Sequence, residues 1–364
     1  MPRILLAPLD WGLGHATRCI PLIGELRARG CEVVLAADGA IAKLLAQEFP
    51  DLELLPLRGY AIRYSKGHTA YSLLLKIPHI FQCIRHEQKW LQSLLSKERF
   101  DCIISDNRPG LYHPSVYTVY ITHQLGIRSG FGTGADRLLH RFHSRFIRKF
   151  NKLWVPDLPG EPNLAGLLSH PPAATVLPRY LGLLSRLQPT TPGTLCQLLI
   201  LLSGPEPQRS ILEEKLIHQL QFFKGTVLLV RGLPREERVT VPLPPHIQVA
   251  AHLSATRLQQ ALAGAELVIC RSGYTTLMDL VRLRKKAVLI PTPGQTEQEY
   301  LARHMEDLRL FPFLTQKEFQ LNQALELAKD FPYSNPFTEA DYEQYTDAVD
   351  ELLAEISKDS PALP

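Results

Sequence analysis

The sequence lacks any apolar run long enough to cross a membrane and any cysteine pair spaced for a metal site. A spanning helix needs about 18 or more apolar residues in a row, and no segment of the 364 residues approaches that length. Asp10 interrupts the first apolar run too early for a secretory signal, so we expect a cytoplasmic protein. The cysteines lie far apart, which predicts reduced core residues, no zinc site and no disulfide framework. They are Cys19, Cys31, Cys83, Cys102, Cys196 and Cys270.

Several motifs of well-known enzyme classes are also missing. The chain has no Asp-x-Asp, which often holds a metal and a diphosphate, and no Gly-x-x-x-x-Gly-Lys-Ser/Thr loop. It has neither His-Glu-x-x-His nor Gly-x-Ser-x-Gly. We therefore expect no metal and no cofactor. The charge of a phosphorylated substrate would be met by backbone amides, a helix dipole and arginines.

Positive charge is concentrated in the first half of the chain. Residues 1–178 hold 21 Lys and Arg against 14 Asp and Glu, a net charge of +7, and the remainder holds 19 against 22, or −3. A basic half favours an anionic partner, such as nucleic acid, a phosphorylated substrate or a membrane surface. No recognised nucleic-acid module or base-stacking array accompanies these cations, so we expect no nucleic-acid partner.

Strand-like and helix-like segments alternate along the chain, in two series separated by a Pro- and Thr-rich stretch at residues 171–192. Repeated strand–helix–strand order predicts parallel sheets with helices on both faces. We therefore expect an α/β protein with two Rossmann-like domains facing across a cleft. The predicted parts are an N-terminal domain at 1–178, a C-terminal domain at 179–336, and a C-terminal helix and tail at 337–364.

Most elements of this alternation have clear predicted limits. The predicted strands cover 3–8, 32–37, 101–105, 116–122, 196–202, 226–231, 247–251, 266–270 and 287–290. The predicted helices cover 17–29, 40–48, 71–97, 208–221, 254–263 and 339–357, with two more starting near residues 275 and 297.

The loop after the first predicted strand carries the first candidate site, in the sequence Asp10-Trp11-Gly12-Leu13-Gly14-His15-Ala16-Thr17-Arg18. Gly12 and Gly14 let the backbone approach a ligand, and the start of the next helix attracts anions. Thr17 fills the last position of Gly-x-Gly-x-x-Gly, which disfavours a nicotinamide cofactor. His15 titrates near neutral pH and can take a proton from a hydroxyl, although a helix-capping histidine would fit the position too.

Two further acceptor-side candidates follow predicted strands. Asp106 and Asn107 come directly after the strand at 101–105, and His123 follows the strand at 116–122. Asp106 or His123 would be the next choice for the base if His15 were not, and Asp106 can also be a turn-forming residue beside Pro109-Gly110.

The second half repeats this arrangement in two loops. Ser203, Gly204 and Arg209 follow that half's first strand, where they can hold phosphate or form an ordinary turn. The stronger segment is Cys270-Arg271-Ser272-Gly273-Tyr274-Thr275-Thr276, in which a strand ends and a threonine-rich helix start offers amides and hydroxyls to a diphosphate.

Polar residues further along these helices suit a nucleotide sugar. Asp279 lies one turn into the helix, where a carboxylate can accept both ribose hydroxyls. Gln298 and Glu299 open the next helix after Pro291 and suit a hydroxyl-rich sugar, although acidic residues also favour a helix start without any ligand.

Residues 137–154 combine an apolar stripe with six cations and predict an amphipathic helix. Such a helix either packs on the sheet with solvated cations outside, or contacts an anionic membrane surface. The cations are Arg137, Arg141, Arg145, Arg148, Lys149 and Lys152.

At these residues the chain resembles GT-B glycosyltransferases of family 28, most clearly over residues 266–305. The resemblance implies that Thr275 and Thr276 lie at the donor phosphates, with Arg271, Ser272 and Gly273 leading into them. It implies that Asp279 holds ribose, that Gln298 and Glu299 hold the sugar, and that the segment of His252 meets the base. It also implies that Gly12, Gly14, His15 and His123 face the acceptor, and that the C-terminal helix returns toward the N-terminal domain. Asn107, which follows a predicted strand, is expected to face the same cleft.

The sequence departs from the family pattern at three points. Asp279 stands where a glutamate is expected, Glu299 replaces a second glutamine, and the loop at 203–209 lacks a glycine-rich pattern. The Gly-x-Gly-His-x-x-Arg-Cys sequence that ends at Cys19 also resembles nucleotide-sugar hydrolases of the same fold, in which such a histidine activates water.

The resulting expectation is an inverting, metal-independent glycosyltransferase. It would move N-acetylglucosamine or another hexose from a UDP-sugar to a lipid-linked or glycan acceptor of the cell envelope. His15 and Asp106 are the predicted catalytic residues, and a peripheral contact with the inner face of the plasma membrane is expected. The alternatives are a nucleotide-sugar hydrolase and a non-catalytic nucleotide-sugar-binding protein.

Overall fold

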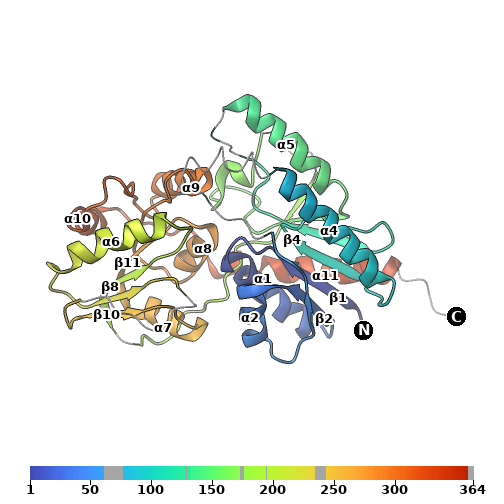
Figure 1. Ribbon diagram of the computed structural model, residues 1–364, viewed down its shortest axis with the longest axis horizontal. Helices are drawn as coiled ribbons and strands as arrows, with labels where there is room; N and C mark the ends of the chain where they lie inside the picture. The colour runs from blue at the N-terminus through green and yellow to red at the C-terminus, as the bar shows by residue number, and fades with distance from the viewer. Residues whose placement is uncertain are drawn as a thin grey trace. The chain divides into compact units, whose positions relative to one another are not determined.

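A computed structural model describes residues 1–60, 77–127, 130, 132–172, 176–193, 195–233 and 243–359. These residues form two compact units (Figure 1). The first unit combines an N-terminal part that ends at Arg186 with a C-terminal part that begins at Thr338, and the second unit runs from Leu187 to Phe337. The first unit extends past the sequence-based boundary at 178 because residues 178–180 form a strand of its sheet.

The first unit contains a parallel sheet of seven described strands in the order β3-β2-β1-β4-β5-β6-β7. Every described pairing is parallel, as the β-α-β alternation predicts. The strands are β1 (Arg3–Pro8), β2 (Glu32–Ala37), β3 (Leu54–Pro56), β4 (Cys102–Asp106), β5 (Tyr117–Ile121), β6 (Lys152–Val155) and β7 (Pro178–Tyr180). The helices are α1 (Leu13–Ala28), α2 (Gly39–Glu48), α4 (Ile77–Leu95) and α5 (Thr133–Ile147), with a 3-10 turn, η1 (Gly166–Leu168).

Strand β1 lies inside this sheet, between β2 and β4, and is buried on both faces, which explains its continuous apolar sequence. Leu5 and Ala7 pack in a cluster with Leu91 of α4, and alternation along the strand places Ile4 and Leu6 on the opposite face. The core therefore holds β1 rigidly, and the loop that follows it starts from a fixed point.

The second unit contains a parallel sheet of five described strands in the order β10-β9-β8-β11-β12. The strands are β8 (Cys196–Leu201), β9 (Val227–Val230), β10 (Ile247–Ala250), β11 (Ala265–Cys270) and β12 (Ala287–Leu289). The helices are α6 (Gln208–Leu220), α7 (Ala255–Gly264), α8 (Tyr274–Arg282), α9 (Thr296–Asp307) and α10 (Leu321–Asp330). One core cluster joins β8 and β11 to α6 and α10.

The C-terminal helix α11 (Gln344–Asp359) belongs to the first unit, as predicted (Figure 1). Val349, Leu352 and Ile356 are buried there, and Glu355 forms an ion pair with Lys152 of β6 at 2.7 Å. The predicted single helix at 339–357 is wrong in one respect: a 3-10 turn, η2 (Glu339–Tyr342), precedes α11. Thr338 and Asp341 cap that turn reciprocally, and the chain leaves it at Glu343 before α11 begins.

Two other helix predictions need correction. The amphipathic helix predicted at 137–154 ends at Ile147, and Lys152 and Trp154 lie in β6, where Trp154 is buried. Trp154 therefore packs in the sheet. Its spacing from the apolar residues of α5 happens to match a helical repeat, so the sequence pattern suggested that the helix continued. Residues 71–76 of the helix predicted at 71–97 lie outside the described residues, and the described helix α4 ends at Leu95. No described helix has the length and apolar character needed to span a membrane.

Candidate functional site

The first group of candidate residues lies at the carboxyl edge of the first sheet. His15 is in the first turn of α1, just after β1, and Asp106 is the last residue of β4. Strands β1 and β4 are neighbours, with Pro8 opposite Asp106, although β2 and β3 intervene in the sequence. The strand order therefore reverses direction between β1 and β4, which is where open α/β sheets bind ligands.

The loop between β1 and α1 requires a glycine at one position. Gly12 precedes the helix with a φ of +124°, a conformation that side chains of L-residues rarely adopt. Asp10 holds the loop from the other side, because its carboxylate accepts a hydrogen bond of 2.8 Å from the backbone N–H of Tyr60. The loop thus delivers His15 to a defined place.

His15, Asp106, Arg18 and His123 form one polar cluster. The Nδ1 atom of His15 lies 3.2 Å from each Asp106 oxygen and 2.9 Å from Nη2 of Arg18. Arg18 donates to Asp106 through Nε at 2.9 Å and also through Nη2. Its Nη1 lies 3.1 Å from Nδ1 of His123. Asp106 is fully buried, whereas the side chain of His15 is 15% exposed.

The cluster sets the charges of its members. Burial alone would raise the pKa of Asp106, but the charges and hydrogen bonds of Arg18 and His15 outweigh burial and lower that pKa below its usual value. Burial lowers the pKa of His15, and the attraction of Asp106 offsets only part of that change. An ionised Asp106 and a neutral His15 are therefore favoured at neutral pH.

The proton on His15 can be placed by the chemistry of its neighbours. Asp106 accepts hydrogen bonds and Arg18 only donates them, so the two compete for Nδ1 of His15. When Nδ1 carries the proton and donates to Asp106, Nε2 keeps a lone pair and can act as a base. A carboxylate that orients a histidine in this way is a common arrangement for proton transfer.

Arg18 is a site residue that sequence reasoning did not select. It is 2% exposed, and its guanidinium contacts all three other members of the cluster. The signal was present in the His-x-x-Arg spacing, because residues three apart share one face of a helix. The remaining acceptor-side candidates lie nearby in the fold. Gly14 is in α1, and Asn107 follows β4 with a φ of +56° and donates its N–H to Ile121 at the end of β5.

The donor-side candidates gather at the carboxyl edge of the second sheet. Ser203 and Gly204 follow β8, and Arg271, Ser272 and Gly273 follow β11. Strands β8 and β11 are adjacent, and β9 and β10 lie on the other side of β8, so this edge too is a point where the strand order reverses.

Arg271 forms hydrogen bonds with several loops at this edge. It is 2% exposed and donates to the carbonyl oxygens of Gln208 at 2.9 Å, Ile290 at 3.1 Å and Pro291 at 3.4 Å. Its Nε lies at the limit of a hydrogen bond, 3.5 Å from the carbonyl of Ser203. Burial lowers the pKa of Arg271 to about 10. Arg271 thus connects the loops that follow β8 and β12 to the start of α6.

Arg209 is already held by protein groups. It forms ion pairs with Glu206 at 2.6 Å and with the buried Glu213 at 3.0 Å, and Glu213 also binds Arg231. Burial would raise the pKa of Glu213, but hydrogen bonds from Arg231 and Arg209 lower it. The guanidinium of Arg209 therefore belongs to a buried charge network beside the predicted phosphate loop.

The other donor candidates line the starts of α8 and α9. Thr275 and Thr276 are partly exposed in the first turn of α8, and Asp279 lies one turn further on. Gln298 is buried and accepts a hydrogen bond of 2.9 Å from the N–H of Thr292, and Glu299 accepts one of 2.8 Å from the N–H of Gly294. His252 is exposed in the loop after β10, at the same edge of the sheet.

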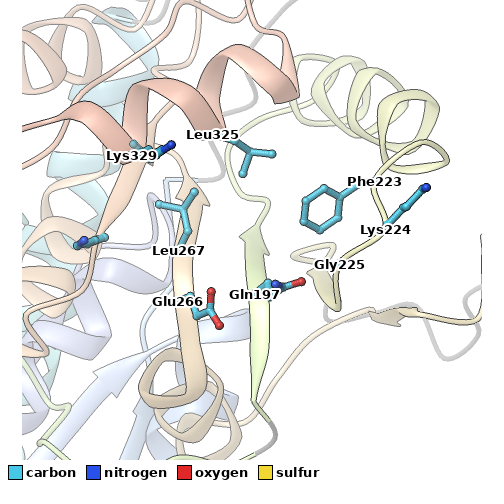
Figure 2. A pocket seen from close by; sticks show the side chains of 10 residues that line it. Gln197, Phe223, Lys224, Gly225, Glu266, Leu267, Leu325 and Lys329 are labelled. Carbon is cyan, nitrogen blue, oxygen red and sulfur yellow. The ribbon is translucent and has the colours of Figure 1, made fainter.

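An open hollow of about 610 Å³ lies at the opposite, amino edge of the second sheet (Figure 2). Gln197 and Glu266 from the starts of β8 and β11 line it, together with the exposed Lys224, Lys286 and Lys329. It contains none of the candidate donor residues. The carboxyl edge is the candidate functional site, because that edge combines the helix starts, the glycine loop and the buried polar groups.

Comparison with known proteins concerns the family and the fold of the chain. Residues 237–352 match the glycosyltransferase family 28 C-terminal domain. The predicted resemblance to family 28 glycosyltransferases is thereby confirmed, and a glycosyltransferase is the enzyme class that the family 28 domain supports. A Pasteurella multocida UDP-N-acetylglucosamine–N-acetylmuramyl-(pentapeptide) pyrophosphoryl-undecaprenol N-acetylglucosamine transferase is 28% identical over 96 residues. That match spans 26% of this chain and 27% of the length of the curated relative.

Solved structures are similar over nearly the whole chain and support the fold. The calicheamicin glycosyltransferase CalG4 has a TM-score of 0.64 at 15% identity, covering 99% of this chain and 100% of that chain. The glycosyltransferase VinC, solved in complex with dTDP, has a TM-score of 0.58 at 14% identity, covering 98% of this chain and 100% of that chain. The predicted GT-B fold with two Rossmann-like domains is confirmed.

Proposed function

We propose that the protein is an inverting, metal-independent glycosyltransferase that moves a hexose, such as N-acetylglucosamine, from a UDP-sugar to a lipid-linked or glycan acceptor. The contact of His15 with the buried, ionised Asp106 is the observation that carries the proposal. The first unit would bind the acceptor, and the second unit would bind the donor.

The proposed reaction is a single displacement. Nε2 of His15 takes the proton of an acceptor hydroxyl while that oxygen forms a bond to the anomeric carbon of the donor sugar. The bond between that carbon and the diphosphate oxygen breaks, and its electron pair leaves with the nucleotide diphosphate. Attack opposite the leaving group inverts the anomeric centre. Asp106 stabilises the imidazolium that forms, and Arg18 keeps Asp106 ionised.

The donor half of the proposal rests on the second unit. The backbone amides at the start of α8 and the hydroxyls of Thr275 and Thr276 would stabilise the departing diphosphate. Asp279 would bind ribose, and Gln298 and Glu299 would bind the sugar. UDP is the proposed nucleotide because of the resemblance to family 28, and dTDP is a necessary comparison because VinC was solved with dTDP.

The test is a transfer assay with UDP-, GDP- and dTDP-sugars, a short-chain polyprenyl-diphosphate-linked sugar as acceptor, and NMR assignment of the product's anomeric configuration. We expect His15→Ala to lower kcat by roughly 10²- to 10⁴-fold, and His113→Ala, in an exposed loop of the same unit, to leave kcat unchanged. Activity should persist in EDTA. Retention of configuration, or near wild-type turnover of His15→Ala, would contradict the mechanism.

The same assay separates the hydrolase from the transferase. The Gly-x-Gly-His-x-x-Arg-Cys sequence resembles that of nucleotide-sugar hydrolases, so a hydrolase is the second candidate, and Arg18 of that sequence contacts His15. A hydrolase would release free sugar from the donor at full rate without acceptor, with water in place of the acceptor hydroxyl. A transferase shows only slow release until acceptor is added. Donor binding with no turnover under either condition would identify a non-catalytic binding protein.

A peripheral contact with anionic membranes on the cytoplasmic side is the last part of the proposal. Arg137, Arg141 and Arg145 are exposed on α5, where Leu138 is 68% exposed and Phe142 is 42% exposed. Lys152 does not belong to this cationic surface, because it lies in β6 and forms an ion pair with Glu355 of α11. Apolar and cationic groups on one surface helix are typical of interfacial binding.

Co-sedimentation with phosphatidylglycerol vesicles tests this contact. Changing Arg141, Arg145 and Arg148 to Gln should abolish binding, and rising salt should weaken binding of the wild type. A matched control removes three charges from the second unit, at Lys224, Lys286 and Lys329, and should bind like the wild type. Equal binding by both variants would show that α5 is not the contact.

A further inference from the structure

A narrow position bordered by two polar side chains lies above Gly204, in the loop after β8. Gly204 has a φ of +96°, so side chains of other residues are strained there. A Cβ atom at this residue would have Oγ1 of Thr292 at 3.3 Å and Nε of Arg271 at 4.0 Å as its nearest neighbours. Both of those groups are hydrogen-bond donors. The space that a side chain would occupy is therefore bordered by a hydroxyl and a guanidinium.

The Thr292 hydroxyl has no partner among the described residues, although Thr292 is fully buried. Burying a hydroxyl without a hydrogen bond is unfavourable, so a ligand that accepts a hydrogen bond from this hydroxyl would bind more tightly. Thr292 is also held firmly in place. Its N–H donates to Oε1 of Gln298 at 2.9 Å, and the carbonyl of Gln298 accepts from Ser272 at 2.8 Å.

Arg271 supplies the charge at this position. Its described hydrogen bonds all go to carbonyl oxygens, and its Nε holds the Ser203 carbonyl only at 3.5 Å. A buried guanidinium that is bound by neutral groups attracts an anionic oxygen strongly. A neutral sugar hydroxyl would leave that charge unbalanced.

We infer that Thr292 and Arg271 receive a phosphoryl oxygen that approaches the backbone over Gly204. Thr292 Oγ1 donates to this oxygen, and the positive charge of the Arg271 guanidinium, whose Nε is 4.0 Å from the Cβ position of residue 204, attracts it. The inference rests on the proposed function in naming the donor diphosphate as the source of that oxygen. It adds Thr292 to the donor site as a residue that distinguishes a diphosphate from the nucleoside alone.

Thr292→Val tests the inference, because valine keeps the side-chain shape and removes only the hydroxyl. Titration calorimetry would measure the Kd of UDP, uridine and inorganic pyrophosphate. We expect Thr292→Val to weaken UDP and pyrophosphate binding about 10-fold or more and to leave uridine binding unchanged. Thr292→Ser, the matched control, keeps the hydroxyl and should remain within about 2-fold of the wild type for all three.

Three results would overturn the inference. Unchanged pyrophosphate binding in Thr292→Val, or a wild type that does not bind pyrophosphate, would show that the hydroxyl serves packing alone. Equal weakening of uridine would show that the substitution disturbs the whole loop. Failure of UDP, GDP and dTDP to bind the wild type would instead refute the proposed donor, and the pyrophosphate arm would still decide the role of Thr292.

Discussion

The buried pair of Arg18 and Asp106 allows a demanding test of the site, because both charges are almost completely removed from water. Arg18 is 2% exposed and Asp106 is fully buried. Removing one member of a buried ion pair leaves the other uncompensated, which lowers the free energy of unfolding by about 3–5 kcal/mol. We expect Arg18→Met and Asp106→Asn each to lower the stability of the first unit by about this amount.

The double variant gives the decisive comparison. With both charges removed, no buried charge lacks a partner, so Arg18→Met/Asp106→Asn should lose no more than about either single variant. The wild type also has a pH signature. The pKa of Asp106 is lowered in the folded state, so its contribution is present at pH 7 and declines below about pH 4, near the unfolded pKa of an aspartate.

Urea unfolding followed by tryptophan fluorescence is the assay. Trp11, Trp90 and Trp154 are the chain's three tryptophans, and all lie in the first unit, so the signal reports that unit alone. Glu87→Gln is a matched control, because Glu87 is equally buried against Arg108 and does not belong to the His15 cluster. Glu87→Gln should lower the free energy of unfolding of the first unit without changing the pH dependence of kcat in the transfer assay. Single-variant losses that simply add in the double variant would refute the coupled pair.

Three smaller predictions follow. Gly182→Ala should destabilise the first unit by about 1–3 kcal/mol, because its φ is +71° and a Cβ would meet the Asp341 carbonyl at 2.2 Å; the same fluorescence assay measures this. Ser254→Ala should lower the stability of the second unit by about 1 kcal/mol, because Ser254 caps α7, and thermal unfolding followed by circular dichroism would detect it. Cys83 should react with a thiol reagent before the other cysteines in the native protein, since the rest are buried, and Cys83→Ser should remove the fast phase.

Much of the fold was predictable because its central strands are short apolar runs that are buried on both faces. The strand limits at Arg3–Pro8 and Glu32–Ala37 agree with the sequence pattern, and the parallel order follows from the alternation with helices. The start of α8 was predicted to within one residue, since Gly273 separates strand from helix. The limits of these strands and helices depend on neighbouring residues in the sequence, so they can be predicted from the local sequence pattern.

Information that depends on distant pairing was not accessible in the same way. Arg18 and Asp106 are 88 residues apart, and no local pattern shows that the two are bound to each other. Arg209 illustrates the same limit from the other side, because Glu206 and Glu213 form ion pairs with the guanidinium that the sequence offered to a phosphate. The end of α5 was misplaced because a buried strand with Trp154 continues the apolar spacing of the helix.

The return of α11 to the first unit gives the chain the connectivity of a domain insertion. Within the described residues, the chain passes between the units near 186–187 and again near 337–338, so two connections join them. Deleting α11 would expose core residues of the first unit, although most of that unit comes from the N-terminal half of the chain. The family 28 match at residues 237–352 includes the second connection, near 337–338.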